Sequence, residues 1–217
     1  MGYSRNTEII SAHISSYPLS LAVETMEYRW LLSGGSDGAV ALYDLESALR
    51  QPHLPSSSSG FGGRNDTCEM FSIRHKKMSS LTQKHTKMIS TVQWYPIDDG
   101  AFLSAGYDGK VFLWDANVFE IVHEFTTNNV VYRAKFHDDG RLIATGLANG
   151  SIRLCDCNSA SSSQVLNGHR MAVTSVQWDP LQPFVLASSS LGWLVGYQAY
   201  CYLVVITTFD IDLILYV

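Results

Sequence analysis

A repeated turn signal constrains the fold of this chain more than any other sequence feature. Three turn dipeptides recur, and an aspartate follows each of them at the same spacing. They are Asp37-Gly38 with Asp44, Asp108-Gly109 with Asp115, and Asn149-Gly150 with Asp156. Asp115 and Asp156 lie 41 residues apart, whereas Asp44 and Asp115 lie 71 apart. The chain is therefore an array of units of about 40 residues, and the first unit carries an insertion of about 30.

The second copy, which begins at His85, shows the plan of one unit. Three short apolar segments are separated by turn residues, and a fourth segment ends near Phe125. The segments are 89–94, 101–106, 110–115 and 118–125. Four short strands in a unit of about 40 residues predict one blade of a β-propeller. This fold favours a role as a binding scaffold over a role as an enzyme.

The other copies set the predicted boundaries. The fourth copy matches the second up to Ser190, where Leu191 takes the position of the turn aspartate and no Trp-Asp pair follows. We therefore predict an all-β, open and incomplete propeller of about three and a half blades over residues 1–190. The blades are expected near 9–75, 85–125, 128–167 and 168–190, with 68–73 as the outer strand of the first, a Ser/Pro/Gly-rich insertion at 50–66 and a divergent apolar tail at 191–217 outside the repeat.

The tail has an ambiguous composition. Residues 191–209 carry no charge and are long enough to cross a bilayer. Polar residues such as Gln198 dilute this stretch, and no lysine or arginine flanks it, so a membrane anchor is not the favoured interpretation. A genuine tail, a membrane segment and a misread transcript end all remain open.

The composition argues against several function classes. Apolar residues make up 46% of the chain, charged residues 16%, and the net charge is −5, so the chain lacks the basic field that draws proteins to nucleic acid. The four cysteines show no C-x-x-C pairing, and the glycines form no phosphate-binding loop. Cys155 and Cys157 could face one ion from a strand, but two further ligands are missing nearby. We expect no cofactor, no metal site and no direct nucleic-acid binding.

One set of side chains could be mistaken for catalytic machinery. His85, Ser104 and Asp108 are the residue types of a nucleophile, a base and an orienting acid in acyl transfer. A repeated fold carries such a set several times for structural reasons, and no G-x-S-x-G motif is present. We therefore expect no enzyme activity.

Several segments resemble a known family. They are 32–38 with 42–46, the run Thr91-Val92-Gln93-Trp94-Tyr95-Pro96, Leu154-Cys155-Asp156, and Gly168-His169-Arg170. Together they resemble the WD-repeat family and, within it, the Cockayne syndrome group A family, over about residues 8–190. In WD-repeat blades a histidine, a serine, an aspartate and a tryptophan form a buried hydrogen-bonded network. The resemblance implies that role for His85, Ser104, Asp108 and Trp114, and turn or blade-end roles for Asp37, Asp44, Asp115, Asn149, Asp156 and His169.

The resemblance also implies a function. Proteins of this kind form seven-blade propellers and act in the nucleus as substrate receptors of a cullin-RING ubiquitin ligase in transcription-coupled nucleotide excision repair. The implied partners are the damaged-DNA-binding propeller adaptor of that ligase and repair or RNA polymerase factors. This chain departs from the pattern because Ala116 and Asn117 follow Trp114-Asp115, so the Trp-Asp-x-Arg motif is missing. A truncated non-functional or regulatory isoform, or a WD-repeat scaffold of another complex, remains an alternative.

Overall fold

The structure is a computed structural model in which strands and tight turns dominate. It describes residues 17–46, 75–78, 85–182, 185–192, 200–201, 203–207 and 214–216. In that part of the chain the only helical residues are Leu45 and Glu46. Among the described residues, no helix combines the length and apolar character needed to cross a membrane.

Four antiparallel sheets contain the strands. The first sheet has β1 (Pro18–Val23), β2 (Trp30–Gly35), β3 (Val40–Asp44) and β4 (His75–Met78). The second has β5 (Ile89–Trp94), β6 (Ala101–Gly106), β7 (Lys110–Asp115) and β8 (Glu120–Thr126). The third has β9 (Val131–Phe136), β10 (Leu142–Leu147), β11 (Ser151–Asp156) and β12 (Ser161–Asn167). The fourth has β13 (Val173–Trp178), β14 (Val185–Gly192), β15 (Tyr200–Cys201), β16 (Leu203–Thr207) and β17 (Ile214–Tyr216).

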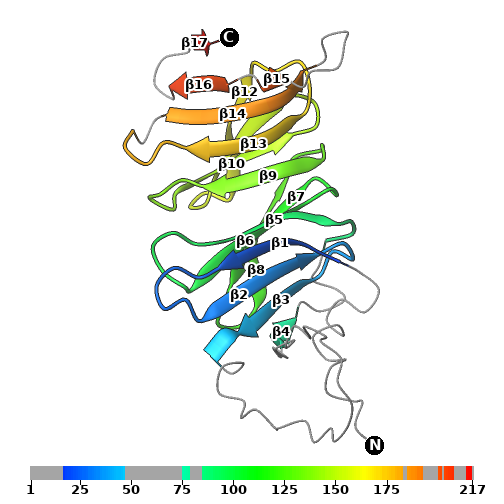
Figure 1. Cartoon of the computed structure of the whole chain (residues 1–217), viewed down its shortest axis with the longest axis vertical. Helices are drawn as coiled ribbons and strands as arrows, with labels where there is room; N and C mark the ends of the chain where they lie inside the picture. The colour runs from blue at the N-terminus through cyan, green and yellow to red at the C-terminus, as the bar shows by residue number, and fades with distance from the viewer. Residues whose placement is uncertain are drawn as a thin grey trace, which may run out of the picture.

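The sheets follow one another in chain order as the blades of an open array (Figure 1). The first strands of the sheets, β1, β5, β9 and β13, lie next to each other and form the inner strands. In the first three sheets the chain then steps outward, strand by strand, to β4, β8 and β12. The first and fourth sheets lie at opposite ends of the stack. The predicted all-β fold with an open array of propeller blades is confirmed.

Three apolar layers fill the spaces between neighbouring sheets. Alternation along each strand sends one set of side chains toward the preceding sheet and the other toward the following sheet. The layer between the first and second sheets includes Leu32, Val40, Val92, Phe102 and Trp114. The next layers include Leu103, Val111, Ala134, Ile143 and Cys155, and then Ala144, Leu154, Val173, Trp178 and Leu186.

The turn glycines contact the following sheet. Gly38, Gly109 and Gly150 have φ angles of +80°, +78° and +86°, which L side chains rarely adopt. A Cβ atom on Gly38 would overlap the backbone oxygen of His85, so only glycine fits there. The amide of His85 donates to the oxygen of Gly38 at 3.0 Å, and the amide of Thr127 donates to the oxygen of Gly109 at 2.8 Å. Each of these two turns is therefore docked onto the loop that begins the next sheet.

The first and last sheets differ from the prediction. The outer strand of the first sheet is β4, whereas the expected strand at 68–73 lies outside the described residues. Residues 191–217 were expected outside the repeat, but β16 pairs with β14 in the fourth sheet, with Ala187 opposite Val205. The run Val204-Val205-Ile206-Thr207 has high β-propensity, which is sufficient for a strand without the Trp-Asp signal.

The register of the fourth sheet also corrects the position of Leu191. Its amide donates to the oxygen of Ala172, as the amide of Tyr107 donates to the oxygen of Met88 in the second sheet. Leu191 is therefore the counterpart of Tyr107. Gly192, not Leu191, takes the place of the turn aspartate Asp108.

Candidate functional site

The structure brings the four network residues of the second sheet into one chain of hydrogen bonds. His85 lies in the loop before β5, Ser104 on β6, Asp108 in the β6–β7 turn and Trp114 on β7. The Nδ1 atom of His85 lies 3.0 Å from Oδ1 of Asp108, and its Nε2 atom lies 2.8 Å from Oγ of Ser104. The indole Nε1 of Trp114 donates to the same Ser104 oxygen at 2.8 Å. One loop, two strands and one turn of the second sheet therefore contribute to a single buried network.

The direction of these bonds follows from the chemistry of the groups. An indole nitrogen only donates and a carboxylate only accepts. With neutral imidazole, Nδ1–H donates to Asp108, the Ser104 hydroxyl donates to Nε2, and Trp114 donates to the Ser104 oxygen. Every polar atom of this path has a partner, which is the condition for a buried network to stabilise a fold.

The same geometry explains why this Ser, His and Asp set is structural. Ser104 is 0% exposed, and its oxygen already accepts from the Trp114 indole, so no substrate reaches it. Burial raises the pKa of Asp108, but the hydrogen bond from His85 and the backbone amides of Thr86 and Lys110 act in the opposite direction, and the net result is a lowered pKa. The carboxylate is thus held ionised as a fixed acceptor.

The third sheet replaces each member of the network. Register places Thr127, Thr145, Asn149 and Cys155 where the second sheet has His85, Ser104, Asp108 and Trp114. Thr127 Oγ1 lies 2.8 Å from the oxygens of both Gly109 and Asn129, and Thr145 donates to the oxygen of Arg153. Asn149 accepts from the amide and hydroxyl of Ser151. These groups bond to nearby backbone and turn atoms, and no connected side-chain path links them.

The fourth sheet keeps half of the network. His169 Nε2 lies 2.7 Å from Oγ of Ser188, as His85 does from Ser104. Burial lowers the pKa of His169, since Gly192 supplies no carboxylate to favour the charged form.

The turn and blade-end residues act as local caps. Asp37, Asp108 and Asn149 each accept from the amide two residues later, at 3.1 Å. Asp44, Asp115 and Asp156 do the same in the turn after the third strand, at 3.1, 2.7 and 2.9 Å. These recurring residues therefore specify turns, the common use of aspartate and asparagine at such positions.

The cysteine pair lies in and beside the core. Cys155 is buried in the core and Cys157 is half-buried. Burial raises the pKa of the two thiols to about 12 and about 11, so both are protonated at neutral pH. No group of three or more potential metal ligands lies together among the described residues.

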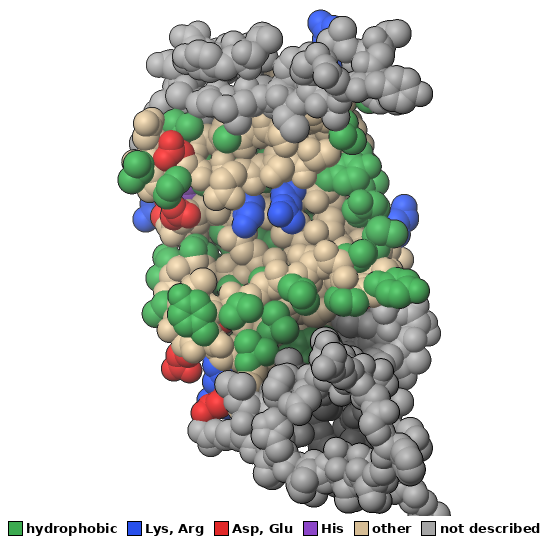
Figure 2. Space-filling model, in the orientation of Figure 1, with side chains coloured by type: hydrophobic (Ala, Val, Ile, Leu, Met, Phe, Trp, Pro, Cys, Tyr) green, Lys and Arg blue, Asp and Glu red, His purple; other side chains and the backbone are tan. Residues whose placement is uncertain are grey.

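Large apolar side chains gather along the edge of the array that carries the hairpin turns between second and third strands. We call this edge the hairpin-turn rim and define it by Tyr17, Met88, Tyr107, Tyr132, Met171 and Leu191. Tyr17 is 78% exposed and Leu191 is 49% exposed. The rings of Tyr107 and Tyr132 meet edge to face across the second and third sheets, with centroids 5.3 Å apart. Figure 2 shows hydrophobic side chains along this right-hand edge.

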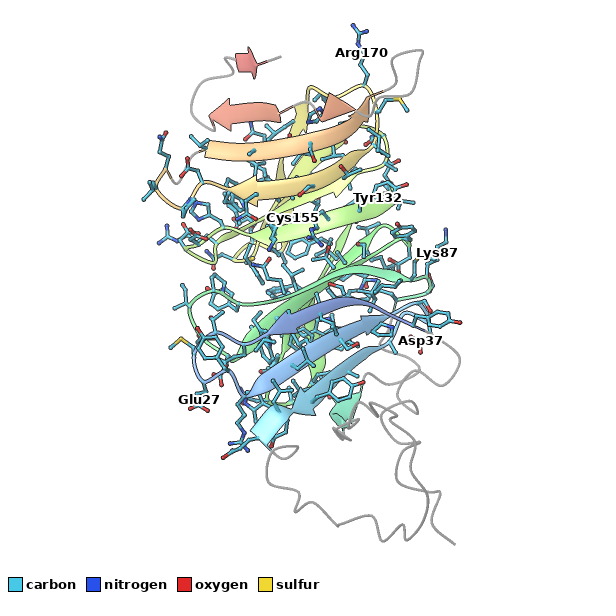
Figure 3. All side chains as sticks on the ribbon, viewed as in Figure 1. Glu27, Asp37, Lys87, Tyr132, Cys155 and Arg170 are labelled. Carbon is cyan, nitrogen blue, oxygen red and sulfur yellow. The ribbon has the colours of Figure 1, made fainter. Side chains whose placement is uncertain are left out.

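The surroundings of the rim differ from those of the opposite edge. In Figure 3, Lys87, Tyr132 and Asp37 lie along the rim side, and Arg170 extends from the fourth sheet. Glu27 lies on the opposite side, where exposed Ile97 and Leu181 alternate with turn aspartates. Tyr, Met and Arg are enriched at the centres of protein interfaces and acidic residues are depleted there. The rim combines such residues with an edge-to-face tyrosine pair and is therefore a candidate protein-binding surface.

Two family models match parts of the chain. The WD domain, G-beta repeat, matches residues 76–115, which include the network of the second sheet. The Anaphase-promoting complex subunit 4 WD40 domain matches residues 127–180, which include the third sheet and β13.

Curated relatives match more of the chain. WD repeat-containing protein ATCSA-1 of Arabidopsis thaliana is 32% identical over 186 residues, which is 84% of this chain and 39% of the relative. Ribosome biogenesis protein WDR12 homolog of Drosophila virilis is 31% identical over 136 residues, 59% of this chain and 32% of the relative. The homolog of Drosophila willistoni is 32% identical over 111 residues, 50% of this chain and 26% of the relative. The chain thus spans between 26% and 39% of the length of these relatives.

The rim is the part of the site that sequence reasoning missed. Tyr107 and Tyr132 belong to different repeats and come together only through packing of the second sheet on the third. The available signal was the large apolar residue Tyr107 directly before the turn dipeptide Asp108-Gly109.

Proposed function

Because this chain is a WD-repeat protein, we propose that it acts by binding protein partners on the hairpin-turn rim. We further propose that it serves as a nuclear substrate receptor of a cullin-RING ubiquitin ligase in transcription-coupled nucleotide excision repair. In that role it has no reaction of its own. It would hold a repair or RNA polymerase factor close to the ubiquitin-loaded enzyme of the ligase.

The exposed aromatic rim carries the general part of this proposal. The interior of the array is packed with apolar side chains, and within the described residues the Ser, His and Asp set of the second sheet is buried. The rim offers tyrosines that are already held by their neighbours, so little side-chain entropy is lost when a partner binds. Rigid aromatic residues of this kind are frequent binding hot spots.

Two observations support the specific part. The segments around Tyr43, Gln93-Trp94-Tyr95-Pro96 and Cys155 resemble the Cockayne syndrome group A family. The match to ATCSA-1 extends over 84% of the chain, more than the match to the WDR12 homologs.

The WDR12 matches favour a second candidate. Relatives named as ribosome biogenesis proteins reach 30–32% identity over half of the chain or more. On that basis the chain would be a scaffold in the assembly of ribosomes.

Binding to the purified damaged-DNA-binding propeller adaptor separates the two candidates. The receptor role predicts that the tagged chain retains the adaptor, with a longer WD-repeat relative as the positive control. Retention by the relative alone refutes that role, and co-sedimentation of the chain with ribosomal precursors would then support the second. A fluorescent fusion tests the proposed nuclear location, and exclusion from the nucleus contradicts it.

Paired variants test the rim. We expect Tyr107→Ala with Tyr132→Ala to weaken partner binding by about tenfold or more, as hot-spot truncations do. The matched control is Tyr28→Ala with Ile97→Ala, which removes exposed apolar side chains from the opposite edge. Both proteins are checked for native circular dichroism. Equal losses of affinity in the two variants would show that the rim is not the binding surface.

A further inference from the structure

The inner strands of neighbouring sheets are joined by side-chain acceptors. Ser20 on β1 accepts from the amide of Val92 on β5 at 3.0 Å. Gln93 on β5 accepts from the amide of Phe136 on β9 at 3.1 Å, and the hydroxyl of Thr91 lies 3.4 Å from the amide of Ala134. These amides point away from the second strand of their own sheet, because alternate amides of an edge strand face outward. Side chains of the preceding inner strand thus satisfy an otherwise open strand edge.

This arrangement changes between β9 and β13. Register places Arg133 where β5 has Thr91, and Lys135 where β5 has Gln93. Neither cation can accept a hydrogen bond. The corresponding outward amides of β13 are those of Val176 and Trp178. Within the described residues no side-chain acceptor bonds to either amide.

The charge at this position is also uncompensated. Arg133 and Lys135 are two residues apart on one strand and therefore share a side. The four inner strands contain no aspartate or glutamate, and neither cation forms an ion pair with a described residue. Burial of the amine, together with the charge of Arg133, lowers the pKa of Lys135. Figure 2 shows basic side chains in the middle of the face, where the inner strands lie.

We propose that Arg133 and Lys135, which we call the inner-edge cation site, bind a carboxylate side chain of an acidic extended segment from a protein partner. Val176 and Trp178 are only 1% and 2% exposed, so the donors within reach of a partner are the two half-buried cations. A carboxylate can accept from several donors at once, so it can take both cationic side chains. The site differs from the hairpin-turn rim and does not depend on the partner proposed there.

An acidic peptide fits this site better than nucleic acid does. Polyanion binding needs many phosphate contacts, typically six to ten in a strong complex. Here two cations lie on a chain with 20 acidic and 15 basic residues. A single extended segment with one or two carboxylates matches the size of one strand edge.

Peptide binding tests the proposal. The probe is a fluorescein-labelled ten-residue glutamate peptide, measured by anisotropy on the full chain, with the matching glutamine peptide for comparison. We expect binding of the glutamate peptide, at least tenfold weaker binding of the glutamine peptide, and a loss of at least tenfold in Arg133→Gln with Lys135→Gln. The matched control, Lys87→Gln with Arg170→Gln, makes the same change in net charge at exposed positions and should change the affinity less than twofold.

Three outcomes overturn the proposal. They are equal binding of the two peptides, equal loss in the two double variants, and tighter binding of a single-stranded oligonucleotide that is lost in the same variant. If the glutamine variant does not fold, Arg133→Lys with Lys135→Arg keeps both charges and should retain the binding. Loss of binding in that folded variant would contradict a charge-based site.

Discussion

The substitution Ser104→Ala tests whether the buried network stabilises the second sheet. The Ser104 oxygen is the shared partner of His85 Nε2 and Trp114 Nε1, at 2.8 Å from each. Alanine leaves both nitrogens buried without a partner, since His85, Ser104 and Trp114 are all 0% exposed. Each unsatisfied buried group costs about 1–3 kcal/mol, so we expect a loss of about 2–6 kcal/mol in the free energy of unfolding. This is a large part of the 5–15 kcal/mol typical of a folded domain.

Ser188→Ala is the matched control. Ser188 has the same place in the fourth sheet, but its only described side-chain partner is His169, which is half-buried. Water can replace that bond, so we expect a loss of about 1 kcal/mol. The difference between the two losses in free energy of unfolding measures the extra stabilisation from a buried serine with two side-chain partners.

Urea unfolding followed by far-UV circular dichroism measures both changes in the free energy of unfolding.

A third variant, Trp114→Phe, removes the indole donor and keeps an aromatic ring against Phe102, whose ring is stacked on that of Trp114 with centroids 5.6 Å apart. In that background Ser104→Ala should cost about 1–3 kcal/mol less, because one nitrogen no longer loses a partner. The reasoning is refuted if Ser104→Ala costs no more than Ser188→Ala, or if the serine and tryptophan substitutions are additive.

Three further predictions follow from the same structure. The pKa of Asp108 is lowered in the folded protein, so its contribution to stability is complete above the unfolded pKa of about 3.9 and is lost as the pH falls through the folded pKa. The urea midpoint should therefore fall less steeply with decreasing pH below pH 4 in Asp108→Asn than in the unmodified protein. An equal pH dependence of the two midpoints would contradict this. Gly140→Ala should cost about 2–3 kcal/mol in thermal or urea unfolding, because Gly140 has φ +73° and a Cβ atom would overlap the Tyr95 ring. Gly100→Ala is the control and should cost less, because a Cβ atom there would meet only the side chain of Asp98, at 3.2 Å from Oδ1, and that side chain can shift. With pKa values of about 12 and about 11, Cys155 and Cys157 should react with iodoacetamide at pH 8 much more slowly than a free cysteine, as read by peptide mass spectrometry; labelling at the free-thiol rate would show that they are exposed.

The sequence predicted the regular part of the fold well. The strands of the second sheet lie within a few residues of their predicted positions, and the third sheet lies within its predicted blade at 128–167, because turn dipeptides and apolar segments alternate there without interruption. The structure also brings His85, Ser104, Asp108 and Trp114 together, as the resemblance to WD-repeat blades implies.

The prediction was weaker where one residue decides the register. The three serines before Leu191 obscure the alignment, and the bond from Leu191 to Ala172 shows that Leu191 is the counterpart of Tyr107. Gly192, the counterpart of Asp108, is the last residue of β14 and pairs with Tyr200. The rim and the inner-edge cation site could not be predicted, because both depend on which sheets pack together. Arg133 and Lys135 look like ordinary polar positions of an alternating strand until β13 is placed beside them.

The docking of the turn glycines onto the next sheet favours an order in which the sheets fold. Gly38 and Gly109 belong to completed hairpins, and their oxygens receive the amides of His85 and Thr127, which are synthesised later. A ribosome-bound chain can therefore finish one sheet and present a formed acceptor to the next loop as it emerges. Domains that fold during synthesis do so from the N-terminal side, and a repeat array adds units to a folded neighbour. The recurring dipeptide thus favours folding of the sheets in chain order, in addition to forming their turns.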